Sequence, residues 1–422
     1  MERRTAACTI VSKNYLAHAR ALYASFAEKN GDSDFYVLLV DENRGEIDLS
    51  KEPFETIMVR EIGVEHFESI AFKYDVTELN TSVKPTFLKY LLLTKNLEKL
   101  VYLDPDIWVY RSLSELYDLL DSHSVLLTPH VLSPIPEDGK AQWEADYLKN
   151  GIFNLGFIAV SHGEEALGFL TWWESRCLRH GFAEVRSGLF VDQKWMDFAP
   201  AFLNNLKVLK EPGYNMAYWN LHERYLQNEN GDWVINGSYP LYFYHFSGMD
   251  LDDPIQISKH QTRYNLSTRK DLAGIFGHYR ETLDLYEVRK LRGLPYSYNY
   301  FSNGEKITTM ARRIYAAHEK YLAESNPFES GGKVYGWLKS RGMLASKDEA
   351  AGFNSMNYDR NDARIKLIHT IMGMLLRILG VNRYTMLMKY ISYKSILRNQ
   401  GDVFDLGFKA ESRVEHEDTE GK

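Results

Sequence analysis

Apolar positions at the start of the chain form two continuous runs with a helically spaced segment between them. The runs at 5–11 and 35–40 predict buried strands, and residues 15–26 carry apolar side chains at helical spacing. A strand, a helix and a second strand of these lengths predict a right-handed βαβ unit and a mostly parallel sheet. The chain therefore opens as an α/β fold of the nucleotide-binding kind.

The same alternation continues to about residue 246. The apolar run at 99–103 predicts a strand that ends directly at Asp104. Residues 129–140 are rich in proline and predict a loop that crosses one edge of a site at the sheet. Other strands are predicted at 57–59, 125–128, 153–160 and 239–246, and helices at 86–93, 112–120, 164–180 and 192–204.

From about residue 272 the pattern changes to helical segments with charged faces, which predict a second unit. A length of 422 residues also exceeds what one compact domain usually uses. We therefore expect an α/β domain over residues 1–270, a helical region over 271–410 and a charged, disordered tail over 411–422.

Composition and charge narrow the function classes. The net charge of -7 arises from mixed signs and argues against a general nucleic-acid binder, which would carry a basic stripe. Cys8 and Cys177 alone provide neither a disulfide framework nor a cysteine-rich metal site, which indicates a reducing cytoplasm. The opening apolar run is too short for an export signal. The apolar stretch 367–381 is shorter than the roughly 20 residues of a membrane span, so we predict no transmembrane helix.

Two acidic residues stand at the end of the strand at 99–103. Asp104 and Asp106 are two positions apart, so on an extended segment both carboxylates face the same side, and Pro105 restricts the backbone between them. A hard divalent ion takes carboxylate and phosphate oxygens together, which suits a diphosphate ligand. Taken alone, the pair favours a solvated acidic turn over a metal site.

Four segments, in sequence order, resemble the motifs of glycosyltransferase family 8. They lie at 89–107, which contains the acidic pair, at 153–157 (Phe-Asn-Leu-Gly-Phe), at 191–193 (Val-Asp-Gln) and at 245–248 (His-Phe-Ser-Gly). The resemblance implies a GT-A fold, which is an α/β Rossmann-like sheet flanked by helices, here with a C-terminal helical region. It also implies transfer of a hexose from a nucleotide diphosphate sugar, UDP-linked in this family, to a glycan or lipid-linked glycan with retention.

The resemblance assigns the metal ligands to Asp104, Asp106 and His245. A mixed shell of carboxylate oxygen and imidazole suits Mn²⁺ better than Mg²⁺, which demands hard ligands and keeps its waters. Without the order of the motifs, His245 would be read as a core histidine.

The resemblance places Asn154, Asp192 and Gln193 beside the donor sugar. An amide such as that of Asn154 can both donate to and accept from sugar hydroxyls. Asp192 and Gln193 are the catalytic candidates. Either Asp192 acts as a nucleophile, or the acceptor attacks from the leaving-group face with Gln193 lining the site, and we favour the second. The structural alternatives are a turn asparagine at 154 and a helix N-cap at 192.

Near the N-terminus, Thr9, Asn14 and Tyr15 match the nucleotide-binding start of the family, with Tyr15 a candidate to stack on the base. Lys89 stands where the family usually has an arginine, which keeps the charge but loses the bidentate fork.

The chain departs from the family pattern at two places. Ser12 and Lys13 replace the acidic residue that often follows the first strand, which puts uridine specificity in question. The Lys-Pro-Trp motif after His-x-x-Gly is absent, so a cation for the leaving diphosphate must come from elsewhere. Lys259 is the candidate, with His260 and Arg263 as alternatives.

Two other functions share parts of this pattern. A nucleotidyltransferase could share the sheet and the metal aspartates, but its phosphate loop needs glycine after the first strand, and residues 10–15 contain none. A non-catalytic sugar-binding protein would not need the intact metal triad.

The segment 363–401 contains seven lysines and arginines and no acidic residue, with apolar residues interleaved. A basic amphipathic helix can lie on an anionic membrane, here the inner face of the cell membrane, and would bring the enzyme to a lipid-linked acceptor. The alternative is that its apolar faces pack on the catalytic domain or on a second copy in a homo-oligomer.

Overall fold

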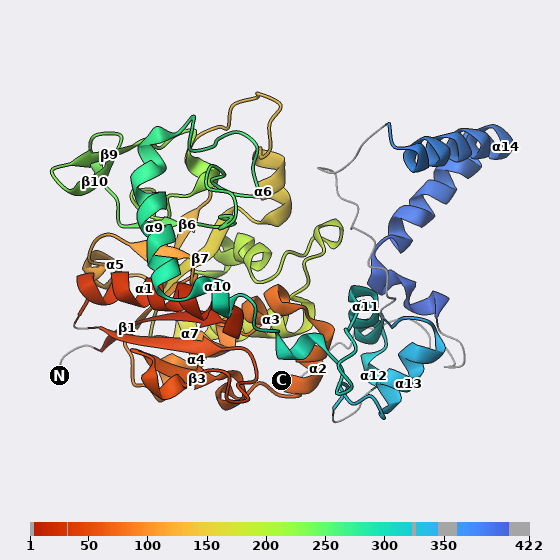
Figure 1. The fold of residues 1–422 in the computed structure, drawn as a ribbon, viewed down its shortest axis with the longest axis horizontal. Helices are drawn as coiled ribbons and strands as arrows, with labels where there is room; N and C mark the ends of the chain where they lie inside the picture. The colour runs from red at the N-terminus through yellow and green to blue at the C-terminus, as the bar shows by residue number, and fades with distance from the viewer. Residues whose placement is uncertain (1–3, 32, 323–325, 345–360, 405–422) are drawn as a thin grey trace. The chain divides into compact units, whose positions relative to one another are not determined.

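The computed structural model describes residues 4–31, 33–322, 326–344 and 361–404. Contacts divide the chain into two compact units, Met1–Tyr300 and Phe301–Lys422 (Figure 1).

The first unit is built on a seven-stranded sheet in the order β3-β2-β1-β4-β7-β6-β8. All neighbours run parallel except β7, which is antiparallel to both β4 and β6. The expected α/β fold with a mostly parallel sheet is confirmed. The strands are β1 (Thr5–Val11), β2 (Asp34–Leu39), β3 (Glu55–Met58), β4 (Lys99–Leu103), β6 (Val125–Pro129), β7 (Phe153–Ser161) and β8 (Leu206–Val208).

Helices cover both faces of this sheet (Figure 1). On one face, α1 (Leu16–Lys29) packs on α9 (Ala273–Leu285) and α10 (Val288–Leu291). On the other, α4 (Lys84–Thr94) packs on α7 (Glu164–His180). Because both faces are covered, β1 and β4 are buried along nearly their whole length and have continuous apolar sequences. The shorter helices of this unit are α2 (Phe67–Lys73), α3 (Val76–Ser82), α5 (Ser114–Leu119), α6 (Glu144–Asn150) and α8 (Ala199–Phe202).

Two smaller sheets complete the first unit. β5 (Ile107–Val109) pairs antiparallel with β12 (Phe243–His245), and this pairing sets His245 opposite Ile107. β9 (Leu226–Glu229), β10 (Asp232–Ile235) and β11 (Tyr239–Pro240) form a three-stranded sheet. The strand expected at 239–246 is therefore split between two sheets, and the helix expected at 192–204 is a 3₁₀ turn followed by α8.

The first unit includes α9 and α10, which the sequence pattern grouped with the C-terminal helices. Ile275, Phe276 and Tyr279 of α9 are buried in the same apolar cluster as Ile107. The ring of Tyr279 stacks on Phe246, with 4.0 Å between ring centroids. This packing makes α9 a wall of the first unit.

The second unit is helical, as expected, with α11 (Thr309–Ala317), α12 (Glu319–Leu322), α13 (Lys333–Ser340) and α14 (Ala363–Lys394). The stretch judged too short to span a membrane lies within α14, which has 32 residues and a mean hydropathy of 1.4 over its most apolar window. Among the described residues, α14 alone is long and apolar enough to cross a membrane by length and composition. Gly380 interrupts it with φ 72° and ψ 164°, which divides α14 into two helical arms.

Candidate active site

The acidic pair lies in the turn between β4 and β5. The backbone N–H of Asp104 donates to the carbonyl of Gly156 on β7 (2.7 Å), and the N–H of Ile107 donates to the carbonyl of Asp104 (3.1 Å). These bonds fix the turn at the edge of the main sheet, with both carboxylates only partly exposed.

His245 completes a cluster with the acidic pair. Its Nε2 lies 2.9 Å from Oδ1 of Asp106 and 3.8 Å from Oδ2 of Asp104. Burial raises the pKa of Asp106, but the neighbouring imidazole of His245 outweighs it and holds that pKa below its usual value. Gly156 gives the histidine room, because a Cβ at position 156 would lie 2.3 Å from Cε1 of His245.

The three side chains fit a divalent ion. Their ligand atoms all lie within 4.8 Å of one another, and they offer two carboxylates and one imidazole. Such a set can hold an ion and leave further coordination positions for phosphate oxygens.

A buried lysine links the acidic pair to Asp192. Nζ of Lys84 lies 2.6 Å from Oδ2 of Asp192 and 3.9 Å from Oδ1 of Asp104. It also donates to the carbonyl of Leu155 (2.8 Å) and lies over the ring of Tyr102. Burial lowers the pKa of Lys84, but the carboxylates of Asp192 and Asp104 outweigh it and raise the pKa above its ordinary value. Burial raises the pKa of Asp192 above its usual value, although the Lys84 ammonium acts to lower it.

Lys89 is not brought to this cluster. It forms an ion pair with Glu174 of α7. Lys84 and Lys89 are five positions apart on α4, and at about 100° per residue they point to different sides of the helix. Lys84, rather than Lys89, is therefore the lysine of α4 at this cluster, and the sequence interpretation missed it.

Asn154 and Gln193 lie in a network of amides and backbone groups. Oε1 of Gln193 accepts from the N–H of Leu155 (3.2 Å), and its Nε2 donates to the carbonyl of Asn150 (3.0 Å). Nδ2 of Asn154 lies 3.5 Å from Oε1 of Gln193 and 3.3 Å from Nε2 of His130. The two predicted residues are thus side by side, within reach of each other.

His130, which the sequence interpretation also missed, sets the orientation of Asn154. Burial lowers the pKa of His130 to about 4, so its imidazole is neutral at neutral pH. In the tautomer that fits, Nδ1 donates to the carbonyl of Ile152 (2.9 Å), and Nε2 then accepts from Asn154.

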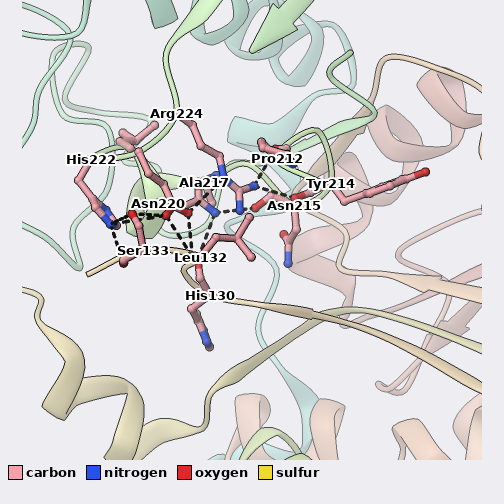
Figure 2. Close-up of polar contacts among 12 residues, drawn as sticks. His130, Leu132, Ser133, Pro212, Tyr214, Asn215, Ala217, Asn220, His222 and Arg224 are labelled. Carbon is pink, nitrogen blue, oxygen red and sulfur yellow. Dashed lines mark hydrogen bonds and ion pairs between the residues drawn. The ribbon is translucent and has the colours of Figure 1, made fainter. Parts of the chain in front are cut away.

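A loop over residues 212–224 is hydrogen bonded to this network. Figure 2 shows it hydrogen bonded to residues 130–133 at the end of β6. Nδ2 of Asn220 donates to the carbonyls of His130 (3.2 Å) and Asn215 (3.0 Å). Nδ2 of Asn215 in turn donates to Oδ1 of Asn154 (3.0 Å). Asn215 has φ 56°, a left-handed conformation that asparagine tolerates better than most residues.

A cleft of about 220 Å³ opens beside the acidic pair. Asn14 and Tyr15 line it together with Asp104 and Asp106, whereas Thr9 is buried within β1 and does not. The ring of Tyr15 stacks on His18, with 4.4 Å between ring centroids. The cleft therefore joins the predicted metal ligands to two of the three residues expected to bind the nucleotide.

Lys13 does not point into this cleft. Its side chain is buried, and Nζ lies 2.9 Å from Oε1 of Glu46 and 3.9 Å from Oδ1 of Asp41. The ammonium of Lys13 is thus neutralised outside this cleft, whereas Ser12 lines it.

The backbone of Lys259 is bonded to the turn that follows His245. Its N–H donates to the carbonyl of Gly248 (2.9 Å), and its side chain is exposed. Gly248 has φ 68°, and a Cβ there would lie 2.4 Å from the ring of His260. This turn therefore requires glycine and packs closely against His260.

Comparison with known proteins shows the enzyme class. Residues 8–163 match the sequence model of glycosyl transferase family 8. The chain is a glycosyltransferase, and this segment is similar to that family. The match includes Asp104, Asp106 and Asn154 and ends before Asp192, Gln193 and His245.

Two curated relatives are similar to this chain over 303 and 249 residues. The chain is 29% identical to the uncharacterized protein YfnF of Bacillus subtilis (strain 168), over 71% of this chain and 98% of that protein. It is 27% identical to YfnD of the same organism, over 58% of this chain and 77% of that protein.

Solved glycosyltransferases are also similar. The galactosyltransferase LgtC, in complex with donor and acceptor sugar analogs, is 14% identical, with 66% of this chain and 95% of that chain covered and a TM-score of 0.41. The glycosyltransferase GlyE of Streptococcus pneumoniae TIGR4 is 15% identical, with 74% of each chain covered and a TM-score of 0.39.

Proposed function

We propose that this glycosyltransferase moves a hexose from a UDP-linked sugar to a glycan or lipid-linked glycan in the cytoplasm, with retention and with a divalent ion. The observation that carries the proposal is the convergence of Asp104, Asp106 and His245, of which the two aspartates also line the cleft with Asn14 and Tyr15. Two carboxylates and an imidazole favour Mn²⁺ over Mg²⁺ as the ion.

In the reaction, the bond between the anomeric carbon and the diphosphate oxygen breaks, and the acceptor hydroxyl oxygen bonds to that carbon. A bound ion would offset the negative charge that builds on the leaving diphosphate. The hydroxyl proton passes to the leaving diphosphate oxygen. Lys259, exposed beside the turn at Gly248, is the cation that we propose to contact this diphosphate.

The surroundings of Asp192 favour direct attack by the acceptor over a covalent intermediate. Its side chain is 2% exposed, and its carboxylate is paired with Lys84. A nucleophile must reach the anomeric carbon with a free oxygen, and this ion pair opposes that. We propose that Lys84 and Asp192 neutralise each other's charge in the site. Asn154, oriented by Gln193 and His130, contacts the donor sugar.

Asn80, which also lines the cleft, supports recognition of the base by an uncharged side chain. Nδ2 of Asn80 on α3 donates to the carbonyl of Val76 (2.8 Å), which fixes the amide. Its Oδ1 is buried and has no hydrogen-bond partner among the described residues. We propose that this oxygen accepts an N–H of the base, in place of the carboxylate missing after β1, while Tyr15 stacks on the base and Asn14 donates to it.

A panel of nucleotide sugars tests the function. The full chain would be incubated with UDP-, CDP-, GDP- and dTDP-linked hexoses and Mn²⁺, and nucleoside diphosphate release measured without an acceptor. We expect slow hydrolysis of a UDP sugar. A chain that releases no nucleoside diphosphate from any donor, with Mn²⁺ or Mg²⁺, would refute the proposal.

A further inference from the structure

The longest helix of the chain leaves its apolar side chains uncovered. No residue of α14 is buried by the residues that the structure describes. In its first arm, four exposed apolar residues recur at helical spacing and form one stripe, while Ile368 and Leu376 are exposed beside it and opposite it. The stripe consists of Leu367, Ile371, Met374 and Ile378, with exposed fractions between 46% and 78%.

The charge of this segment has one sign. Between residues 363 and 401 there are seven lysines and arginines and no aspartate or glutamate. At the two ends, Arg364 pairs with Asp362 and Lys394 pairs with Asp402. Four of the others form no ion pair with a described residue and remain available to anionic groups: Lys366, Arg377, Arg383 and Lys389.

We propose that α14 docks on an anionic phospholipid membrane, with its apolar stripe in one leaflet and its basic residues at the phosphate groups. On the helical wheel, Lys366 and Arg377 lie on one flank, about a quarter turn from the stripe. Long basic side chains on such a flank can reach headgroups while their methylene stems lie along the apolar surface. The pattern is that of an interfacial helix.

The kink at Gly380 argues for docking in one leaflet rather than crossing. The arms at 363–379 and 381–394 span about 26 Å and about 21 Å at 1.5 Å per residue. Both are shorter than the hydrocarbon core of a bilayer, about 30 Å thick. Figure 1 shows the two arms of α14 as separate helical segments that meet at an angle.

Charge also favours lipid over a second copy of the chain. If two copies joined their stripes, the flanking Lys366 and Arg377 would face other basic residues. A helix pair of this kind is normally stabilised by opposite charges on its flanks. The segment has no acidic residue to supply them.

Vesicle flotation tests the proposal. The full chain is expected to float with vesicles of an equimolar mixture of phosphatidylcholine and phosphatidylglycerol at low salt, and to be released by high salt. A variant with Lys366, Arg377, Arg383 and Lys389 changed to Gln should bind such vesicles less tightly, by about fivefold for each charge removed.

A control variant loses the same charge elsewhere. It changes Arg44, Arg179, Lys210 and Lys270 to Gln, all exposed in the first unit and without ion pairs to described residues. It should float like the unmodified chain. A second test variant, Ile378→Asp with Val381→Asp, should lose binding because it places charge on the two most exposed large apolar positions of α14.

Three results would overturn the proposal. The first is no flotation of the full chain at low salt, and the second is equal flotation of the four-Gln variant and its control. The third is a stable dimer of the full chain in sedimentation velocity that dissociates in the Asp variant, when neither the full chain nor that variant binds vesicles. Nucleotide sugar hydrolysis in the same samples separates this outcome from failure of the proposed function.

Discussion

The buried ion pair of Lys84 and Asp192 provides a prediction with a definite size. Both side chains are 2% exposed, and their charged atoms lie 2.6 Å apart. Changing Lys84 to Met leaves the Asp192 carboxylate buried without its partner, which should lower the free energy of unfolding by about 3–5 kcal/mol. Asp192→Leu should cost a similar amount, because it leaves the ammonium uncompensated.

The double variant distinguishes the cost of an unpaired buried charge from the cost of lost contacts. When both charges are replaced by apolar side chains, no buried charge remains unpaired, and only the carbonyl of Leu155 loses a donor. We expect the double variant to be less stable than the native chain by about 1–3 kcal/mol, much less than the sum of the two single changes.

Guanidinium denaturation measures these differences. Trp173 reports on the site, since its Nε1 donates to the carbonyl of Asp192 (3.0 Å). A chelator should be present so that metal binding does not contribute. Lys89→Met is the matched control on the same helix, because its pair with Glu174 is partly exposed and should contribute about 0–1 kcal/mol. Single losses that add up to the loss in the double variant would refute the coupling.

Three further predictions concern the network and the cleft. Asn154→Asp or Gln193→Ala should reduce transfer while UDP affinity, measured by calorimetry, stays nearly unchanged; a large loss of UDP affinity would reassign the residue to the nucleotide. Asn80→Ala should do the reverse and weaken UDP binding about tenfold with Mn²⁺ affinity unchanged, whereas an unchanged UDP affinity would refute its role. Burial lowers the pKa of His130 from 6.5 to about 4, so the folded state binds fewer protons there than the unfolded state. The free energy of unfolding that this group contributes is therefore lost as pH falls from 6.5 to about 4. In His130→Gln this loss should be smaller by about 3 kcal/mol. Denaturation series in which the free energy of unfolding falls equally with pH in the native chain and the variant would contradict this.

Local patterns were sufficient to predict the main sheet and the acidic pair at its edge. The apolar run at 99–103 is a fully buried strand, and it ends at Asp104 as expected. His245 could be grouped with the pair only through the order of the motifs, because the pairing of β5 with β12 joins segments far apart in sequence.

The residues missed were those whose role depends on helix phase or on loops. Lys84 and Lys89 look alike in sequence, and only the start of α4 at Lys84 turns the first toward the site. Pro85 in the first turn was a usable signal for that start. The bonds of Asn215 and Asn220 join their loop to Asn154 on β7 and to His130 after β6, which no local pattern records.

Metal dependence tests the central claim most directly. With the donor identified, release of nucleoside diphosphate would be measured for the native chain and for Asp106→Asn, in chelator and across a Mn²⁺ titration. The account predicts release by the native chain only with the ion, and almost none from the variant, which loses a ligand charge next to His245 while remaining folded. Equal rates in chelator, or a native rate from Asp106→Asn, would contradict it.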